Sequence, residues 1–375
     1  MITRRQIIAQ TAAGIFGATV HTRRAKAFEW TGIPPADAGF VADLDERFDK
    51  LIADKRAWGV HGVVVVRHGR IVLERYFAGD DEVWGAPLGR VAFGPETLHD
   101  LRSVSKSILG LLYGLALAQG KVPSPEQPLL DAFPEYREFA TEARFTAVKV
   151  EHALTMSLGL DWNENIPYQD PANSEIQMEK APDRFRYIFS RAFIAEPGSR
   201  WIYGAAATTL IGRLITKGTG QSLSDFARAT LFDPLGIGAT AWTNGLNGEP
   251  SASSGLRMTP RDLARIGQLI LARGQWDGRQ VVPADWLDRS FRPRLAIDDS
   301  RRYGYFWYLG DPRYGTPPNR PTTPWIGALG YGGQCLFVLT DLDIVVAITS
   351  GNYTDRNQFV PPIRIIREVI LPGVS

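Results

Sequence analysis

Strand patterns lie near both ends of this 375-residue chain, whereas its middle carries helical patterns. Residues 63–66 are four consecutive valines, and residues 71–77 follow after a short turn, which is typical of two strands joined by a tight connection. Residues 334–340 and 344–350 repeat this arrangement near the other end. The simplest assembly brings both ends together in one antiparallel sheet. The sequence therefore predicts an α+β fold with a helical insertion beside the sheet.

Helical spacing of apolar residues marks several segments outside these strands. Residues 43–57 place their apolar side chains on one face, as an amphipathic helix does. Proline and glycine gather in residues 310–333, which predicts a long loop that approaches an active site. The other expected helices are residues 108–118, 151–156, 208–216, 223–229 and 356–371, the last interrupted by Pro361 and Pro362.

The length favours two subdomains, because one hydrophobic core rarely serves so long a chain. We expect residues 28–100 and 255–375 to form a discontinuous sheet domain, and residues 101–254 to form a mainly helical domain. An apolar fraction of 44% and a charged fraction of 22% are those of a soluble globular protein. The net charge is +2 with scattered basic residues, which gives no support for a nucleic-acid partner.

The number and spacing of cysteines and histidines limit which cross-links and metal sites the chain can form. Cys335 is the single cysteine, so the chain has no internal disulfide and its core must stabilise it unaided. The sequence contains no H-E-x-x-H motif and no Cys/His cluster, so neither a metal site nor a cofactor has support from sequence motifs.

The first residues have the three parts of an export signal in order. Two arginines at residues 4–5 precede a modest apolar stretch at residues 7–20, which is too short for a membrane span. An A-x-A cleavage signature follows at residues 25–27. We therefore expect residues 1–27 to be a twin-arginine-type signal peptide and the mature protein to begin near Phe28. The protein would be periplasmic or secreted, without a stable membrane anchor.

Ser103 and Lys106 are three residues apart at the start of an apolar, helix-patterned run. This spacing places both side chains on one face of a helix, where they can touch. Lysine can accept the proton of serine once burial lowers its pKa from about 10.4. Tyr203 is the best candidate to relay the proton, because it lies in a Pro- and Gly-rich turn before an apolar helix. The alternative is a helix-capping serine followed by a solvated lysine.

A Ser-His-Asp triad has less support. The nucleophile-elbow motif G-x-S-x-G is absent, and its nearest match, residues 155–159, lacks the first glycine. His99 and His152 do not lie in a recognisable triad context. The sequence therefore favours the serine–lysine pair over a serine–histidine pair.

Several ordered segments together resemble the serine β-lactamase-like superfamily, in its class C β-lactamase and esterase branch. Within that branch the chain is most similar to the 6-aminohexanoate-oligomer (nylon-oligomer) hydrolases and related carboxylesterases. The resemblance runs from about residue 60 to about residue 353 and rests on residues 103–107, 150–157, 196–203, 254–260 and 329–334.

This resemblance implies roles for individual residues. Ser103 would be the nucleophile, Lys106 its base partner and Tyr203 the third member of the catalytic group. The oxyanion hole would combine the backbone N–H of Ser103 with that of Ala328. The implied fold is an antiparallel sheet flanked by helices plus an all-α domain, with the active site between them. Four aromatic residues could wall the substrate pocket, namely Trp162, Trp201, Trp325 and Tyr331.

Two departures from the family pattern concern the substrate. Lactamases of this branch carry Tyr-x-Asn, but here Ala205 occupies the third position. They also carry Lys-Thr-Gly, where this chain has Trp325 and Ile326 before the glycine. Both losses favour an exported serine hydrolase of small esters or linear amides that works through an acyl-enzyme. The alternatives are a β-lactamase or D-peptidase, and a non-catalytic penicillin-binding-like module. The oligomeric state stays open.

The export signal gives a first testable prediction. When the full chain is expressed in a host with a twin-arginine pathway, N-terminal sequencing of the exported protein should read from Phe28 or an adjacent residue. Replacing both Arg4 and Arg5 by lysine should stop export, because the paired arginines are what this pathway reads. Recovery of only intact, cytoplasmic protein that begins at Met1 would contradict this interpretation.

Overall fold

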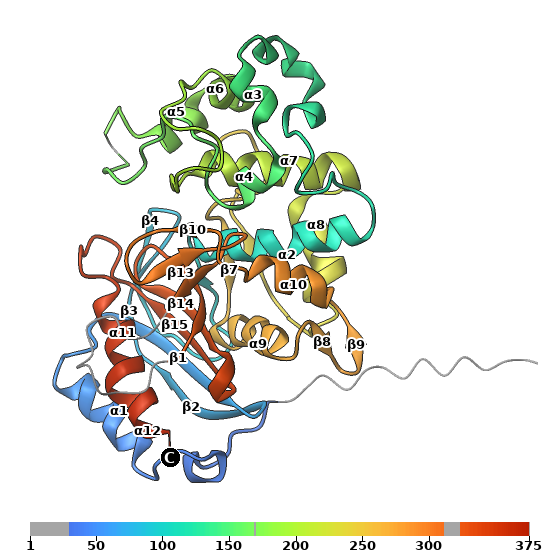
Figure 1. Ribbon diagram of the computed structural model, residues 1–375. Helices are drawn as coiled ribbons and strands as arrows, with labels where there is room; N and C mark the ends of the chain where they lie inside the picture. Colours follow the sequence, from blue (N-terminus) through green and yellow to red (C-terminus); the bar gives the residue numbers. More distant parts are fainter. Residues whose placement is uncertain (1–29, 169, 311–322, 375) are drawn as a thin grey trace, which may run out of the picture.

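The computed structural model describes residues 30–168, 170–310 and 323–374. The expected signal peptide therefore lies outside the described residues. In Figure 1 a group of helices occupies one end of the molecule, and a twisted sheet with flanking helices occupies the other. Within the described ranges, no helix is long and apolar enough to cross a lipid bilayer.

The largest sheet has eight strands, and neighbouring strands in it are antiparallel throughout. Strand β1 pairs with β2 on one side and with β15 on the other, which places Val63 opposite Arg75 and Ile348. The two ends of the chain thus meet in one sheet, and the α+β fold expected from the sequence is confirmed. In spatial order the strands are β10 (Leu295–Ala296), β11 (Arg301–Tyr303), β12 (Tyr308–Gly310), β13 (Trp325–Gly330), β14 (Gln334–Leu339), β15 (Ile344–Ser350), β1 (Val60–Arg67) and β2 (Arg70–Tyr76).

The valine run of β1 is buried on both faces of this sheet. Alternate side chains of a strand point to opposite faces, so Val63 and Val65 join one hydrophobic core while Val64 and Val66 join the other. All four side chains are fully buried. A strand covered on both faces needs a continuous apolar run instead of an alternating one, and this explains the sequence.

The face that carries Val63 is covered by the first helix and by the C-terminal helices (Figure 1). The sequence predicted a C-terminal helix interrupted by Pro361 and Pro362, whereas the observed helix begins at Val360 with both prolines in its first turn. Proline fits there because the first turn has no intrahelical partner for its missing N–H. The covering elements are α1 (Leu44–Ala53), α11 (Val360–Arg364), the π-helical turn η6 (Ile365–Ile370) and α12 (Leu371–Gly373).

The face that carries Val64 is covered by α2 (Val104–Ala118) and α9 (Pro260–Leu271), and α10 (Ala284–Ser290) packs on α2. Helix α9 packs on β1, β14 and β15. It begins with a capped turn, in which Thr259 Oγ1 accepts a hydrogen bond from the Asp262 N–H at 3.1 Å and Pro260 occupies the first helical position. Helix α2 packs on β13 and on α7, so it joins the sheet to the helical part.

The helical part lies above α2 in Figure 1. Helix α7 contains the run expected at residues 208–216 and packs against α2 and α4. The helices of this part are α3 (Ala143–Ala147), α4 (Val150–Leu154), α5 (Ser174–Lys180), α6 (Arg184–Phe189), α7 (Ala205–Thr219), α8 (Leu223–Ala227) and the π-helical turn η4 (Arg228–Phe232). Short 3₁₀ helices are η1 (Pro35–Ala38), η2 (Leu130–Ala132), η3 (Pro134–Thr141) and η5 (Thr340–Leu342).

In the part of the chain that the structure describes, three small sheets accompany the large one, and one of them leads to the candidate site. Strand β5 pairs with β7, which sets Asp100 opposite Arg257 just before the chain enters α2. The small sheets comprise β3 (Gly79–Val83) with β4 (Ala86–Val91), β5 (His99–Asp100) with β7 (Leu256–Met258) and β6 (Ala241–Trp242), and β8 (Gln275–Trp276) with β9 (Arg279–Gln280).

The loop expected at residues 310–333 needs correction. Residues 325–330 are strand β13, which is paired with β12 and β14 inside the large sheet. Glycines at positions 327 and 330 suggested a loop, but each lies where a Cβ would collide with a neighbour, namely the Trp325 ring at Gly327 and the Leu101 carbonyl at Gly330. Residues 311–322 lie outside the described ranges.

Candidate active site

Ser103 and Lys106 meet at the N-terminus of α2. Ser103 is the N-cap residue, and Lys106 Nζ lies 3.1 Å from Ser103 Oγ. The same ammonium donates to the Ser253 carbonyl at 2.9 Å, and the lysine side chain is buried. Arg102, directly before the serine, has a φ of 50°, a left-handed conformation that turns the chain sharply from β5 into the helix. The spacing predicted from the sequence therefore brings the hydroxyl and the amine into contact.

Tyr203 reaches the same place from the start of α7. Its ring centroid lies 5.0 Å from Lys106 Nζ, and the Ser103 side chain is near enough to influence the pKa of its phenol. The segment before it is held by a hydrogen bond from the Ile202 N–H to the Met156 carbonyl at 2.7 Å. Two segments that are far apart in the sequence thus place a hydroxyl, an amine and a phenol together.

Burial controls the protonation of this group. Desolvation lowers the pKa of Lys106, and the negative charges of Glu164 and Glu175 oppose that shift. Desolvation also raises the pKa of Tyr203 well above its usual value. Burial thus shifts Lys106 toward the neutral amine, which can accept a proton, while the two carboxylates favour the ammonium form. Tyr203 stays protonated and can donate a hydrogen bond or pass a proton on.

The expected oxyanion donors lie on two elements that touch. Ser103 is at the N-terminus of α2, where backbone N–H groups and the helix dipole favour negative charge. Ala328 is buried on β13, one residue beyond the point where Gly327 pairs with Tyr308 of β12. A Cβ on Gly330 would lie 2.3 Å from the Leu101 carbonyl oxygen, so the end of β13 passes close beside the turn that carries the serine.

Three of the four expected pocket aromatics lie near these residues. The Trp201 and Tyr203 ring centroids are 5.8 Å apart, and Trp162 packs against the backbone of Gly204. Tyr331 lies over Arg102, whose guanidinium carbon is 5.9 Å from the ring centroid.

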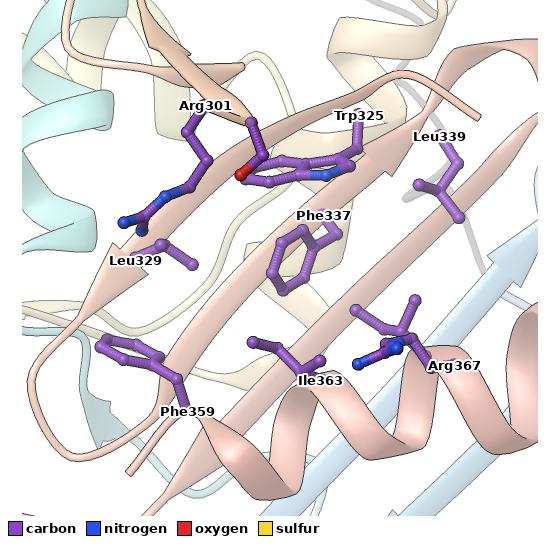
Figure 2. A pocket seen from close by; sticks show the side chains of 10 residues that line it. Arg301, Trp325, Leu329, Phe337, Leu339, Phe359, Ile363 and Arg367 are labelled. Atoms are coloured by element: carbon purple, nitrogen blue, oxygen red, sulfur yellow. The ribbon is translucent and has the colours of Figure 1, made fainter. Parts of the chain in front are cut away.

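The expectation for Trp325 is wrong. Its ring packs against Phe337 with centroids 5.2 Å apart, in a cavity of about 160 Å³ beneath α11 (Figure 2). Alternation along β13 puts Ile326 and Ala328 on the face toward α2 and Trp325 on the opposite face. A side chain at position 325 therefore cannot line the pocket at Ser103.

Sequence reasoning missed two carboxylates at the site. Glu164 Oε2 accepts hydrogen bonds from the Ala205 N–H and from Trp162 Nε1, both at 2.7 Å. It thereby satisfies a free N–H at the start of α7, next to Tyr203. Glu164 sits in a loop among other polar residues, with no periodicity or motif that would single it out.

Glu175 is the second of these carboxylates and lies in the first turn of the short helix α5. It is buried, accepts a hydrogen bond from Ser253 Oγ at 3.3 Å and lines a cavity of about 340 Å³ together with Arg102, Tyr168 and Tyr331. Burial, reinforced by the charge of Glu164, raises the pKa of Glu175 to about 7. Ser253 thus joins both halves of the site, because its carbonyl holds Lys106 and its hydroxyl holds Glu175.

The competing serine is placed differently. Ser157 is fully buried, and its hydroxyl contacts Thr155 Oγ1 at 2.7 Å and the His152 backbone carbonyl at 3.4 Å. The imidazole of His152 accepts instead from the Lys149 N–H at 3.1 Å. Ser157 therefore has neither the histidine contact nor the exposure that a triad nucleophile needs.

Comparison with known proteins gives a consistent result. The family model described as Beta-lactamase matches residues 44–366. The chain is 27% identical over 263 residues to a 6-aminohexanoate-dimer hydrolase of Paenarthrobacter ureafaciens, covering 66% of this chain and 59% of that protein. It is also 27% identical over 209 residues to the esterase EstB of Burkholderia gladioli, covering 53% of this chain and 51% of that protein. The chain thus spans less than two thirds of the length of these curated relatives.

Solved structures share the fold. A protein from Bacillus anthracis, proposed to be a 6-aminohexanoate-dimer hydrolase, superposes with a TM-score of 0.69 at 20% identity, covering 87% of this chain and 82% of that one. A class C β-lactamase mutant gives a TM-score of 0.65 at 17% identity, covering 88% and 97%. At such low identity these two likenesses concern the fold alone.

The contrast between the two serines can be tested by covalent labelling. A fluorophosphonate probe should modify Ser103, which is partly exposed and touches Lys106, and should leave the buried Ser157 unmodified. Peptide mass spectrometry locates the adduct. The Ser103→Ala variant should lose labelling completely, whereas the matched Ser157→Ala variant should keep it. An adduct on Ser157 in the native chain would overturn the assignment of the nucleophile.

Proposed function

The chain belongs to the β-lactamase family, and we propose that it is a serine hydrolase that cleaves small esters or linear amides through an acyl-enzyme. The observation that carries this proposal is the 3.1 Å contact between Ser103 Oγ and the buried Lys106 amine. A buried lysine with a lowered pKa is a competent base for a serine hydroxyl. The names of the two relatives, a dimer hydrolase and an esterase, support both kinds of bond as substrates.

In the proposed reaction, Lys106 Nζ accepts the Ser103 proton while Ser103 Oγ bonds to the substrate carbonyl carbon. The backbone N–H groups of Ser103 and Ala328 would hold the charge that develops on the carbonyl oxygen. Tyr203 passes the proton to the departing alcohol or amine as its bond to the carbonyl carbon breaks. Water then attacks the acyl-serine, and its proton returns to Ser103 by the same route. The products are a carboxylic acid and the alcohol or amine.

The charges around the site argue against a β-lactam as the preferred substrate. Trp325 stands on the opposite face of β13, Ile326 is apolar and Ala205 has no side-chain amide, so none of these residues can pair with a β-lactam carboxylate. Glu164 and Glu175 add negative charge close to Lys106, as their effect on its pKa indicates. A substrate carboxylate would meet repulsion here instead of an ion pair.

The same charges favour a substrate with a cationic group. The other charged groups beside the cavity are paired, Arg102 with Glu82 and Arg184 with Glu179. When Lys106 is neutral, the carboxylate of Glu175 has no cation to balance it. Two tyrosine rings of the cavity, Tyr168 and Tyr331, stand perpendicular to each other with centroids 6.3 Å apart, and such aromatic faces attract ammonium groups. An ω-amino acyl group would satisfy both features.

We also propose that the enzyme acts outside the cytoplasm, in the periplasm or the medium. The support is the order of paired arginines, apolar stretch and A-x-A signature in the first 27 residues. Folding before export suits a chain whose single cysteine, Cys335, is buried in a core.

The substrate class can be tested by comparing kcat/KM values. Hydrolysis of p-nitrophenyl butyrate or of a short linear ω-amino-acid amide should exceed hydrolysis of nitrocefin by at least about a hundredfold, which is about 2.7 kcal/mol of transition-state stabilisation. Ser103→Ala is the control for each substrate and should abolish all turnover. Comparable values for nitrocefin and the butyrate ester would favour a β-lactamase, and no turnover of any substrate would favour a non-catalytic module.

The cationic preference has its own test, which uses two esters of equal length that differ only in a terminal amino group. Glu175→Gln should lower kcat/KM for the amino ester by about tenfold and change the neutral ester little, because an opposite charge is removed. In the wild type, the kcat/KM of the amino ester divided by that of the neutral ester should rise as the pH increases through about 7, where Glu175 becomes ionised. Protonation of Lys106 affects both esters alike and cancels in the ratio.

Glu138→Gln is the matched control, because this glutamate is half exposed and pairs with Arg186 away from the cavity. It should leave both esters unchanged. Glu175→Gln could instead lower kcat/KM equally for the amino ester and the neutral ester. That result would show that Glu175 supports the site structurally and does not recognise a cation.

A further inference from the structure

A second cluster of ionisable side chains lies apart from the serine site. His61 of β1, Asp81 of β3 and His99 of β5 converge, and their ligand-type atoms lie within 4.8 Å of one another. All three side chains are buried, with exposed fractions of 3%, 4% and 0%. The proposed hydrolysis uses none of them. Their positions in the sequence, about 20 residues apart, match no short metal-binding motif, which is why only the fold reveals them.

Two of the three pairs of ligand atoms have the spacing of neighbouring ligands on one metal ion. His61 Nδ1 lies 2.9 Å from His99 Nε2, and His99 Nε2 lies 3.6 Å from Asp81 Oδ1. Zinc–ligand bonds of about 2.0–2.1 Å at angles of about 90–120° separate neighbouring ligand atoms by about 2.9–3.6 Å. The observed distances of 2.9 Å and 3.6 Å lie at the lower and the upper end of this range.

The donors are also oriented as metal ligands are. His99 Nδ1 lies 2.9 Å from the Asp100 carbonyl oxygen, so this nitrogen carries the hydrogen and Nε2 presents its lone pair to the cluster. A backbone carbonyl on the other ring nitrogen is the usual partner of a metal-binding histidine. Tyr353 donates to Asp81 Oδ1 at 2.8 Å, and the Phe93 ring stacks on His61 with centroids 4.4 Å apart. Each ligand is therefore held in place by a neighbour.

Charge around the cluster leaves room for a cation. The nearby carboxylates are those of Asp81, Asp100 and Glu82. The nearby guanidiniums are two, Arg102 paired with Glu82 and Asp100, and Arg257 paired with Asp81 and Asp100. Three carboxylates therefore face two guanidiniums around the cluster.

We propose that His61, Asp81 and His99 form a structural site for a divalent transition-metal ion, with zinc the best match to two imidazoles and one carboxylate. Oxygen-preferring ions such as magnesium and calcium fit this donor set poorly. The ion would fasten β3 and β5 to strand β1 of the large sheet, and β5 leads within four residues to Ser103. In a chain that can form no internal disulfide, it would supply a cross-link of another kind.

The ion would enter while the chain folds, because the ligands are buried in the folded protein. The test therefore refolds the purified chain from denaturant with and without zinc, removes loose metal with a chelator, and measures bound zinc by atomic spectroscopy. We expect about one zinc per chain and a higher melting temperature after refolding with zinc. Refolding with cobalt(II) should give the visible absorption of a bound ion.

Variants locate the bound metal. His61→Gln and His99→Gln should each lower bound zinc and cobalt absorption by at least about tenfold. Asp81→Asn, which keeps the side-chain shape, is a milder variant for the case in which the histidine variants fail to fold. His68→Gln is the matched control, because this histidine is exposed in the turn between β1 and β2 and pairs with Asp343. It should bind metal as the native chain does.

Two results would overturn the site. One is a native chain that holds less than about a tenth of a zinc ion after refolding with the metal, which would mean that His61 and His99 simply hydrogen bond to each other. The other is full metal retention by Asp81→Asn or by a folded histidine variant, which would place the ion elsewhere. Because the readout is bound metal, neither result depends on whether the proposed hydrolase activity is correct.

Discussion

The pairing of β1 with β15 is the contact on which the rest of this molecule depends. It sets Val63 to Val66 against Val345 to Ile348, and the four valines of β1 are fully buried. Burial of each valine side chain contributes about 1.5–3 kcal/mol relative to its exposure. Because the two strands come from opposite ends of the chain, their pairing closes everything between them into one large loop. The helical part is an insertion whose position is set by this closure and by the contact of α2 with β13.

Ion pairs connect this strand framework to the turn before Ser103, the proposed nucleophile. Arg257 of β7 forms an ion pair with Asp100 of β5. Arg102, in the turn directly before Ser103, forms ion pairs with Asp100 and with Glu82 of β3. Removing one partner from a buried pair costs about 3–5 kcal/mol, because the other charge is left alone in an apolar region. The left-handed conformation of Arg102 is therefore held from both sides, and the serine is fixed at the start of α2.

The balance of buried charge at Lys106 links reactivity to selectivity. Burial alone favours a neutral amine, while Glu164 and Glu175 favour the ammonium form. The same two carboxylates are the basis of the proposed preference for uncharged or cationic substrates. In this proposal the site works without the Lys-Thr and Asn groups of the lactamases.

Local patterns in the sequence determined the valine strands, the α+β class and the contact between Ser103 and Lys106, because periods of 2 and 3.6 residues and a three-residue spacing act within one element. Only the tertiary structure decided what comes together across elements. Glu175 reaches the serine site and His61 meets His99 through strand pairing and helix packing, which no local pattern encodes. Trp325 shows the reason most plainly. A shift of one residue along a strand moves a side chain to the opposite face, so its place beneath α11 and away from the active site was fixed by the register of β13 against β12 and β14.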